Sequence, residues 1–186
     1  MSGIRIIGGR HRGRRLTTPR DRSIRPTAER TREALFNILD HAGRVKDARF
    51  LDLFCGTGAV GIEAFSRGAG EVWLIDESIE LARINVDALG NPSTLHLRRL
   101  DARRLGRPPC PFDVIFLDPP YRSGLAGEVL AALDASWLAA DALIIVELGA
   151  KEELETPPGF TLQEDRRHGA ARMLFFRPGS DASAPI

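Results

Sequence analysis

The sequence predicts an α/β fold, a doubly wound and mostly parallel sheet of seven strands. Short apolar runs typical of buried strands alternate with helical segments, and the connecting loops are short. The last two strands, residues 160–167 and 171–176, flank a His-Gly turn and form an antiparallel hairpin. A small arginine-rich hairpin precedes the sheet. In such folds ligands bind beyond the carboxyl ends of the parallel strands.

Turn residues and apolar periodicity set the elements in chain order. Residues 4–16 form the glycine-punctuated N-terminal hairpin, and a helix follows Pro26 and ends before Gly43. Glycine, proline and asparagine then separate the remaining segments. We expect strands at residues 50–55, 72–75, 94–100, 114–117 and 143–146, and helices at residues 60–67, 78–89 and 124–133.

Length and composition limit the organisation of the chain. Its 186 residues suffice for one domain with a single core. We expect residues 1–26 to form the basic hairpin and a linker, residues 27–178 the α/β domain, and residues 179–186 a disordered tail. The two cysteines, Cys55 and Cys110, lack metal-ligand or disulfide spacing, and no segment is apolar enough to span a membrane. We therefore expect a cytoplasmic protein with no metal and no membrane partner.

Charge is distributed unevenly along the chain. The first 32 residues hold ten arginines and two acidic residues, a net charge of +8, so with a total of +1 the remainder carries −7. A basic arm before an acidic body is typical of proteins that meet a polyanion. We expect nucleic acid to contact Arg5, Arg10, Arg12, Arg14, Arg15, Arg25 and Arg32.

A glycine-rich loop follows the first strand of the domain. Gly56, Gly58 and Gly61 fit the spacing G-x-G-x-x-G between a strand and a helix. Gly56 and Gly58 allow a sharp turn and a close approach of the backbone to a ligand, while Gly61 lets the helix lie close to the strand. The motif predicts a site for a nucleoside-containing cofactor, with Thr57 inside the loop.

Two acids narrow the identity of this cofactor. Asp76 ends the second strand about 20 residues after the loop, where an acid holds a ribose. Asp52 lies inside the first strand, where it would repel a pyrophosphate and attract the ammonium and sulfonium groups of S-adenosylmethionine. The sequence therefore favours S-adenosylmethionine over a dinucleotide.

The fourth strand ends in the tetrapeptide Asp118, Pro119, Pro120 and Tyr121. The exocyclic amine of a nucleobase is a poor nucleophile because its lone pair is delocalised into the ring. The Asp118 carboxylate and the Pro119 carbonyl, held by the fixed φ of two prolines, could accept hydrogen bonds from this amine and free its lone pair. Tyr121 could stack on a base swung out of its helix. These four residues are our candidate catalytic group.

These motifs together resemble the class I S-adenosylmethionine-dependent methyltransferases with a Rossmann-like fold that act on amino nitrogens. The N-terminal half is similar to the RsmD family, which methylates N2 of guanine 966 in bacterial 16S ribosomal RNA. The similarity extends from about Arg5 to Arg177. It is carried in this half by the segments Arg5–Gly9, Arg12–Arg14, Arg25–Thr27 and Arg32–Leu39.

The resemblance implies roles for individual residues. Gly56 and Gly58 would border the methionine part of the cofactor, Asp76 would hold the ribose hydroxyls, and Asp101 with the Ala102 backbone would meet the adenine. The remaining cofactor-binding candidates are Asp52, Thr57 and Asp118. The resemblance also implies 16S ribosomal RNA as partner. We expect this RNA in an assembled small-subunit particle and the enzyme as a monomer, while the sequence leaves open whether the substrate is naked RNA or a particle.

Other functions remain open on the sequence alone. An N6-adenine or N4-cytosine methyltransferase would use the same tetrapeptide, and the glycine loop also permits a nucleotide-dependent oxidoreductase. A non-catalytic RNA-binding module would account for the basic arm but not for the acids at four strand ends. The sequence assigns no role to Glu147 or to the turn at residues 166–168.

Overall fold

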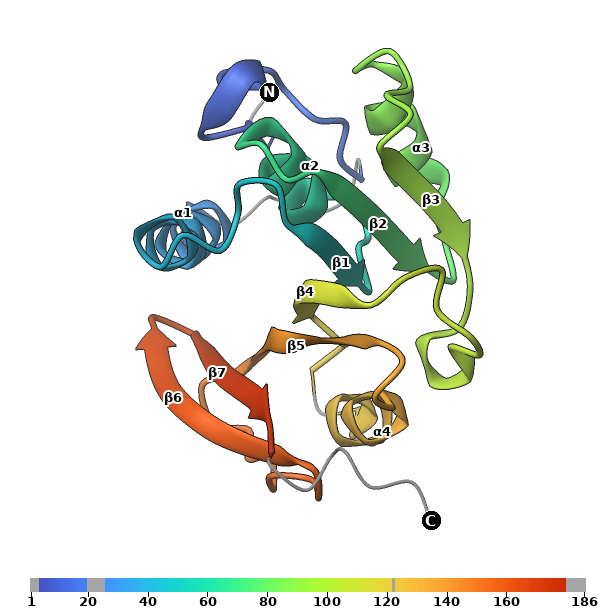
Figure 1. Ribbon diagram of the computed structural model, residues 1–186. Coiled ribbons are helices and arrows are strands. Elements are labelled where there is room, and N and C mark those ends of the chain that lie inside the picture. The colour runs from blue at the N-terminus through green and yellow to red at the C-terminus, as the bar shows by residue number, and fades with distance from the viewer. Residues whose placement is uncertain (1–3, 20–25, 122, 180–186) are drawn as a thin grey trace.

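The chain folds around a twisted sheet that carries helices on both faces (Figure 1), in a computed structural model that describes residues 4–19, 26–121 and 123–179. Arg25 and the expected tail from residue 180 lie outside the described residues. The strands are β1 (Arg49–Leu53), β2 (Glu71–Asp76), β3 (Leu95–Arg99), β4 (Phe112–Leu117), β5 (Leu138–Gly149), β6 (Phe160–His168) and β7 (Ala171–Pro178). The helices are α1 (Pro26–His41), α2 (Ala59–Ser66), α3 (Glu80–Asp87) and α4 (Leu125–Ala132), with 3-10 helices η1 (Gly9–His11) and η2 (Ala102–Arg104).

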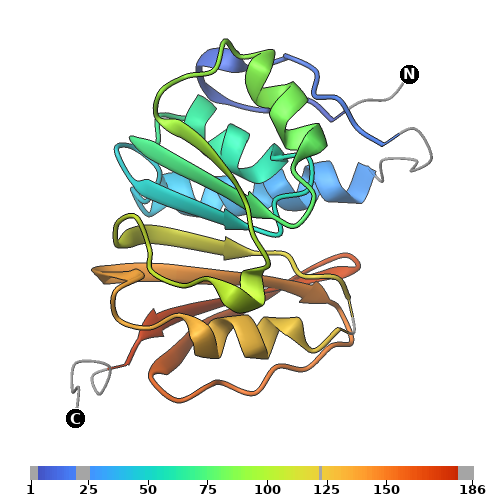
Figure 2. The same cartoon turned by 90° about the vertical axis from the view of Figure 1, so that its right-hand side faces the viewer.

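The described part of the chain forms one seven-stranded sheet in the order β3-β2-β1-β4-β5-β7-β6. Neighbouring strands from β3 to β5 are parallel, and β7 runs antiparallel to both β5 and β6 (Figure 2). The predicted sheet and its antiparallel C-terminal hairpin are therefore confirmed. The strand order reverses at β1 and β4, so a crevice is expected above their carboxyl ends.

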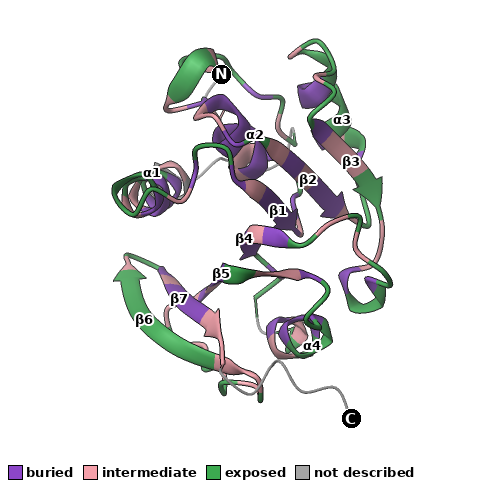
Figure 3. Cartoon of the chain, in the orientation of Figure 1, coloured by how far each residue is buried: buried purple, intermediate pink, exposed green. Residues whose placement is uncertain are grey.

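Each face of the sheet has its own apolar core. On one face α1, α2 and α3 contribute side chains such as Phe36, Phe65 and Val86. On the other face η2 and α4 contribute Ala102 and Leu130. The central strands are buried between these layers, whereas the edge strand β6 is largely exposed (Figure 3). Two-sided burial explains why the central strands read as continuous apolar runs in the sequence.

The arginine-rich segment, residues 4–19, is anchored to the domain. The expected hairpin is present as a short antiparallel pairing: Arg5 and Arg15 form a β-bridge, and backbone hydrogen bonds join residues 4–6 to residues 13–16 on both sides of it. Two of its apolar side chains, Ile6 and Leu16, are 2% and 5% exposed and belong to the main core. This segment is thus packed on the domain along most of its length.

Glu63 of α2 holds this segment in place. Its side chain is fully buried and accepts hydrogen bonds from the N–H groups of Ile7 and Gly8, both at 2.7 Å. The Arg67 side chain donates to the same carboxylate at 2.7 Å, and Arg32 Nε lies 3.8 Å from it. These donors satisfy a charge that would otherwise be costly to bury.

Arg32 was expected on the nucleic-acid surface, and the structure corrects this placement. Its side chain is 5% exposed and donates to the backbone carbonyl of Arg5 at 2.6 Å. Burial lowers its pKa, and the nearby Glu63 opposes that effect. Arginine is seldom buried without a partner, and the sequence did not reveal that Glu63, 31 positions later, would be buried beside it.

Candidate active site

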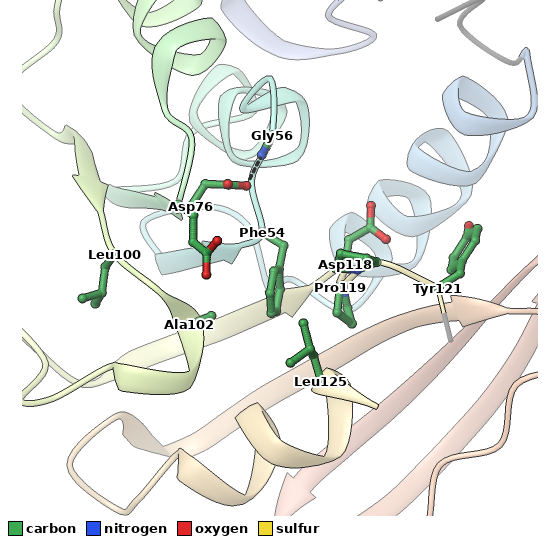
Figure 4. A pocket seen from close by; sticks show the side chains of 11 residues that line it. Phe54, Gly56, Asp76, Leu100, Ala102, Asp118, Pro119, Tyr121 and Leu125 are labelled. Carbon is green, nitrogen blue, oxygen red and sulfur yellow. Dashed lines mark hydrogen bonds between the residues drawn. The ribbon is translucent and has the colours of Figure 1, made fainter. Parts of the chain in front are cut away.

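Two adjoining cavities lie at the carboxyl edge of the central strands. The larger has a volume of about 650 Å³, which is in the usual range for small-molecule sites. Asp76 at the end of β2 and Asp118 after β4 lie on either side of Phe54 in this cavity (Figure 4). Leu100 and Ala102 add an apolar wall.

The glycine loop meets the larger cavity through its backbone. The N–H group of Gly56 donates to the Asp76 carboxylate at 2.9 Å (Figure 4), and Ser78 N–H donates to the other oxygen at 2.9 Å. Gly56 has a φ of +54°, and no neighbouring atom lies within 4 Å of the place a Cβ would take. The structure therefore brings these two predicted cofactor-binding residues, Gly56 and Asp76, together on one cavity.

Gly58 and Gly61 set how closely α2 lies on the sheet. Gly58 precedes α2 with a φ of +77°, and a Cβ on Gly61 would come within 2.2 Å of Leu74 on β2. Close helix packing is the role predicted for Gly61. Thr57 borders the smaller cavity, and its carbonyl accepts a hydrogen bond from the Asn85 amide at 2.9 Å.

The smaller cavity, about 210 Å³, shares Phe54, Gly56 and Asp118 with the larger one. Asp52 lines it with a side chain that is 1% exposed and accepts the Gly61 N–H at 2.8 Å. Burial raises the pKa of Asp52 to about 8, in spite of that hydrogen bond. The neutral acid is therefore favoured at pH 7, and a cationic ligand beside it would favour the carboxylate.

Asp118 and Glu147 form a pair of acids on this cavity, which Asp52 also lines. They come directly after Leu117 and Val146, which are paired in register on β4 and β5. Asp118 is an exposed residue at the mouth, yet the protein around its carboxyl group desolvates it and raises its pKa to about 6. Desolvation and the charge of Asp118 raise the pKa of Glu147 to about 8. Near neutral pH such a pair shares one proton.

The four predicted catalytic residues all line the larger cavity. Pro119 is buried, whereas Pro120 is exposed and the Tyr121 residue is 52% exposed. The Tyr121 ring stands beside the Asp118 carboxylate at the mouth (Figure 4). A carboxylate, a carbonyl held by two prolines and an accessible ring therefore lie together, as recognition of a flat polar ring requires.

Asp101 is occupied by a neighbour. Its carboxylate caps η2, accepting the N–H of Arg103 at 2.9 Å, and pairs with the Arg103 side chain at 2.9 Å. The hydrogen bond from that side chain lowers the pKa of Asp101. Of the two residues expected at the adenine, Ala102 lines the larger cavity, and a contact from Asp101 stays a prediction.

Two arginines of the N-terminal segment contact the ends of α2 and α3. Arg10 lies over the Phe65 ring, 3.9 Å from its centroid, and Arg14 donates to the Ala88 carbonyl at 3.4 Å. Phe65 is in the last turn of α2, so the tip of this segment is about 10 Å from the glycine loop. Their contact with nucleic acid stays a prediction, as does that of the exposed Arg5, Arg12 and Arg15.

Two residues of the site received no role from the sequence. Phe54 lies between the cavities with a φ of +62°, a conformation rare for an aromatic residue and typical of strained functional sites. The position of Phe54 and its positive φ are visible only in the folded loop. Glu147 faces Asp118, and its position at a strand end was the signal available in the sequence.

The described residues contain neither a cluster of metal ligands nor a membrane-spanning helix. Within them no three His, Cys, Asp or Glu side chains are grouped to hold a metal ion. No helix in the same part is long and apolar enough to cross a membrane.

The sheet order, the glycine loop and the acids at the strand ends define a class I S-adenosylmethionine-dependent methyltransferase. The chain belongs to the family described as Conserved hypothetical protein 95, whose model matches residues 4–177.

Known proteins agree with this assignment. The chain is 40% identical to ribosomal RNA small subunit methyltransferase D of Escherichia coli K12 over 159 residues, covering 83% of this chain and 79% of that protein. A solved structure described as putative methyltransferase yhhF from Escherichia coli has a TM-score of 0.83 at 35% identity, covering 97% of this chain and all of that one. Magnesium protoporphyrin IX methyltransferase from Synechocystis, with bound SAM, is 17% identical with a TM-score of 0.63, covers 86% of each chain and shares the fold alone.

Proposed function

We propose that this chain transfers a methyl group from S-adenosylmethionine to the exocyclic N2 of a guanine in 16S ribosomal RNA, at position 966 by family resemblance. One observation carries the proposal: a turn of sequence Asp-Pro-Pro-Tyr stands at the mouth of a cavity that the glycine loop also lines. The similarity to methyltransferase D of the small subunit supports the substrate class.

The residues of the larger cavity fit the cofactor. Bound S-adenosylmethionine supplies a methyl group on a positively charged sulfur, which leaves as a neutral thioether once the methyl carbon has bonded to nitrogen. Asp76 would hold the ribose hydroxyls, and Leu100 with Ala102 would cover the adenine. Asp52, buried at the adjoining cavity, would become the favoured carboxylate beside the positive charge.

The turn at the mouth would prepare the amine. The Asp118 carboxylate and the Pro119 carbonyl would accept its two N–H groups, which favours a tetrahedral nitrogen with a free lone pair. After transfer the nitrogen must lose a proton, and Asp118, with a pKa of about 6, can take it and return it to solvent through the mouth. Tyr121 would stack on the flipped base.

We further propose that the enzyme acts as a monomer in the cytoplasm on a small-subunit particle. The basic segment along α2 would contact phosphates of the RNA around the target, while the crevice receives the base. Residues 27–178 would then be the methyltransferase domain, and residues 1–26 the basic hairpin and linker that contact RNA.

Nucleoside mass spectrometry tests the proposal. The purified protein, S-adenosylmethionine with a labelled methyl group, and RNA or particles lacking the modification should yield labelled N2-methylguanosine. Labelled N6-methyladenosine or N4-methylcytidine would support the alternative enzymes instead. No transfer to either naked RNA or particles would contradict the proposed function.

A further inference from the structure

Two acids of the crevice, Asp118 and Glu147, have no partner for their carboxyl groups in the part of the chain that the structure describes. Among the described residues, neither group accepts a hydrogen bond or forms an ion pair. Other strand-end acids differ, because Asp76 accepts two N–H groups and Asp101 is paired with Arg103. Acids that line a cavity without a protein partner are candidates for binding a ligand.

We propose that Glu147 reads the target base, its carboxyl group accepting a hydrogen bond from guanine N1–H and donating one to O6, while Asp118 accepts from N2–H. The inference rests on the proposed function and deepens it, since it makes Glu147 the residue that selects guanine.

Strand geometry places the two carboxyl groups together. Leu117 and Val146 are register partners on parallel β4 and β5. The next residue along the chain is Asp118, directly after β4, in one case and Glu147, within β5, in the other. Side chains alternate between faces; the residues before that pair, Phe116 and Ile145, belong to one core, so Asp118 and Glu147 point to that same side. Both line the smaller cavity, where a base edge can meet both.

The surroundings keep one proton on the pair. The other charged or titratable groups lining this cavity are Arg32, Asp52 and Cys55. Arg32 is held by Glu63 and by the Arg5 carbonyl, and Asp52 and Cys55 add no positive charge. Asp118 is the more exposed of the two residues, and an aspartate has the lower ordinary pKa, so at pH 7 the charge is favoured on Asp118 and the proton on Glu147.

Guanine matches this pattern of donors and acceptors. Its Watson–Crick edge presents the N2 amine, the N1–H donor and the O6 acceptor side by side. An ionised Asp118 beside a neutral Glu147 offers an acceptor for the amine, then an acceptor and a donor for the other two atoms. If adenine bound with its amine at Asp118, its N1 acceptor and its C2–H group would face Glu147. One of the two hydrogen bonds to Glu147 would then be lost.

Base substitution combined with mutation tests this assignment. Single-turnover kcat/KM would be measured on RNA with guanine or 2-aminopurine, which keeps the amine but lacks N1–H and O6, at the target position. Wild type should prefer guanine by about 10- to 100-fold, the discrimination expected of one good pair of contacts. Glu147→Leu should bring the ratio close to one, and Glu147→Gln should keep it because the amide offers the same acceptor and donor. Glu128→Gln, an exposed acid on α4, is the control.

A pH profile adds a second measure. Between pH 7 and 9 the wild-type rate should fall relative to that of Glu147→Gln, because only the acid loses its donor proton. A wild-type ratio retained by Glu147→Leu would overturn the assignment. Weaker binding of S-adenosylmethionine by Glu147→Leu with an unchanged ratio would place Glu147 on the cofactor and also overturn it. If wild type methylated neither RNA, the proposed function itself would fail.

Discussion

Two glutamates on the same side of the sheet, Glu63 and Glu147, have opposite surroundings. Glu63 is fully buried, yet it receives two backbone N–H groups, a hydrogen bond from Arg67 and the nearby charge of Arg32. Glu147 receives no hydrogen bond from any described residue and faces a second acid across a cavity. Burial alone therefore does not distinguish an anchoring acid from one that serves a ligand.

The two acids differ in the element that carries them and in the part of the fold where that element places them. Glu63 is in the body of α2, where it joins the N-terminal segment to the domain by local hydrogen bonds. Glu147 is at the carboxyl end of β5, the edge where ligands of parallel sheets bind. Changes at Glu63 should therefore affect stability, and changes at the crevice should affect activity.

The largest expected effect is the loss of stability on replacing Glu63. Glu63→Ala leaves Arg32 and the N–H groups of Ile7 and Gly8 buried without their acceptor. Removing one partner from such a buried pair costs about 3–5 kcal/mol of unfolding free energy. Urea denaturation measures it, with Glu33→Ala on the exposed face of α1 as control. A loss below about 1 kcal/mol, as at a surface site, would contradict the anchoring role of Glu63.

Asp118→Ala should give the next largest effect, on activity instead of stability. Turnover should fall by two to three orders of magnitude, or roughly 3–4 kcal/mol, the scale of losing one preorganised electrostatic partner. Single-turnover methylation measures the loss, and calorimetry should find binding of S-adenosylmethionine nearly unchanged. Asp87→Ala, at the exposed end of α3, should retain full activity. Near-normal methylation by Asp118→Ala would remove Asp118 from the reaction.

The sequence was sufficient for the fold and for the larger cavity because these depend on local patterns. Buried runs and glycine spacing located β1 and the loop, and polar residues at strand ends located Asp76 and Asp118. Those signals were enough because parallel strands bring their carboxyl ends to one edge.

Long-range pairing was not visible in the sequence. Arg32 was placed on the surface because nothing local signals a buried acid on α2. One local pairing was missed as well: Asp101 is held by Arg103, two residues away, because the sequence did not predict the short 3-10 helix η2 that Asp101 caps. The proton shared by Asp118 and Glu147 depends on two strands meeting in register, which only the folded chain specifies.

A smaller effect is expected in the pH dependence of stability. Glu147 has a pKa of about 8 in the folded chain against 4.5 as its ordinary value. Its contribution is fully present below pH 4.5 and is lost as the pH rises through 8, because the folded chain resists ionisation there. Between pH 5.5 and 8.5 wild type should lose more stability than Glu147→Gln, by on the order of 1–2 kcal/mol, since the cavity admits water. Denaturation at both pH values measures this, and parallel losses would contradict the raised pKa.

The smallest expected effect concerns the exposed arginines of the N-terminal segment. Deleting the segment is an unsuitable test, because Ile6 and Leu16 are core residues and Glu63 would lose its donors. Arg12→Gln removes one exposed charge and leaves that packing intact. If Arg12 contacts a phosphate, the slope of log affinity against log salt should become shallower by about 0.7–0.9, with affinity falling a few-fold at low salt.

RNA binding measured across a salt series distinguishes this role from a general charge effect. Arg107→Gln removes an equally exposed arginine from the loop before β4, at the amino edge of the sheet, and should leave the slope unchanged. Equal slopes of log affinity against log salt for wild type and Arg12→Gln would mean that RNA does not contact the tip of the N-terminal segment. The phosphate contacts would then lie at the mouth of the crevice, where β6 and β7 turn beside the end of β5, and the basic segment would serve only to complete the core through Glu63.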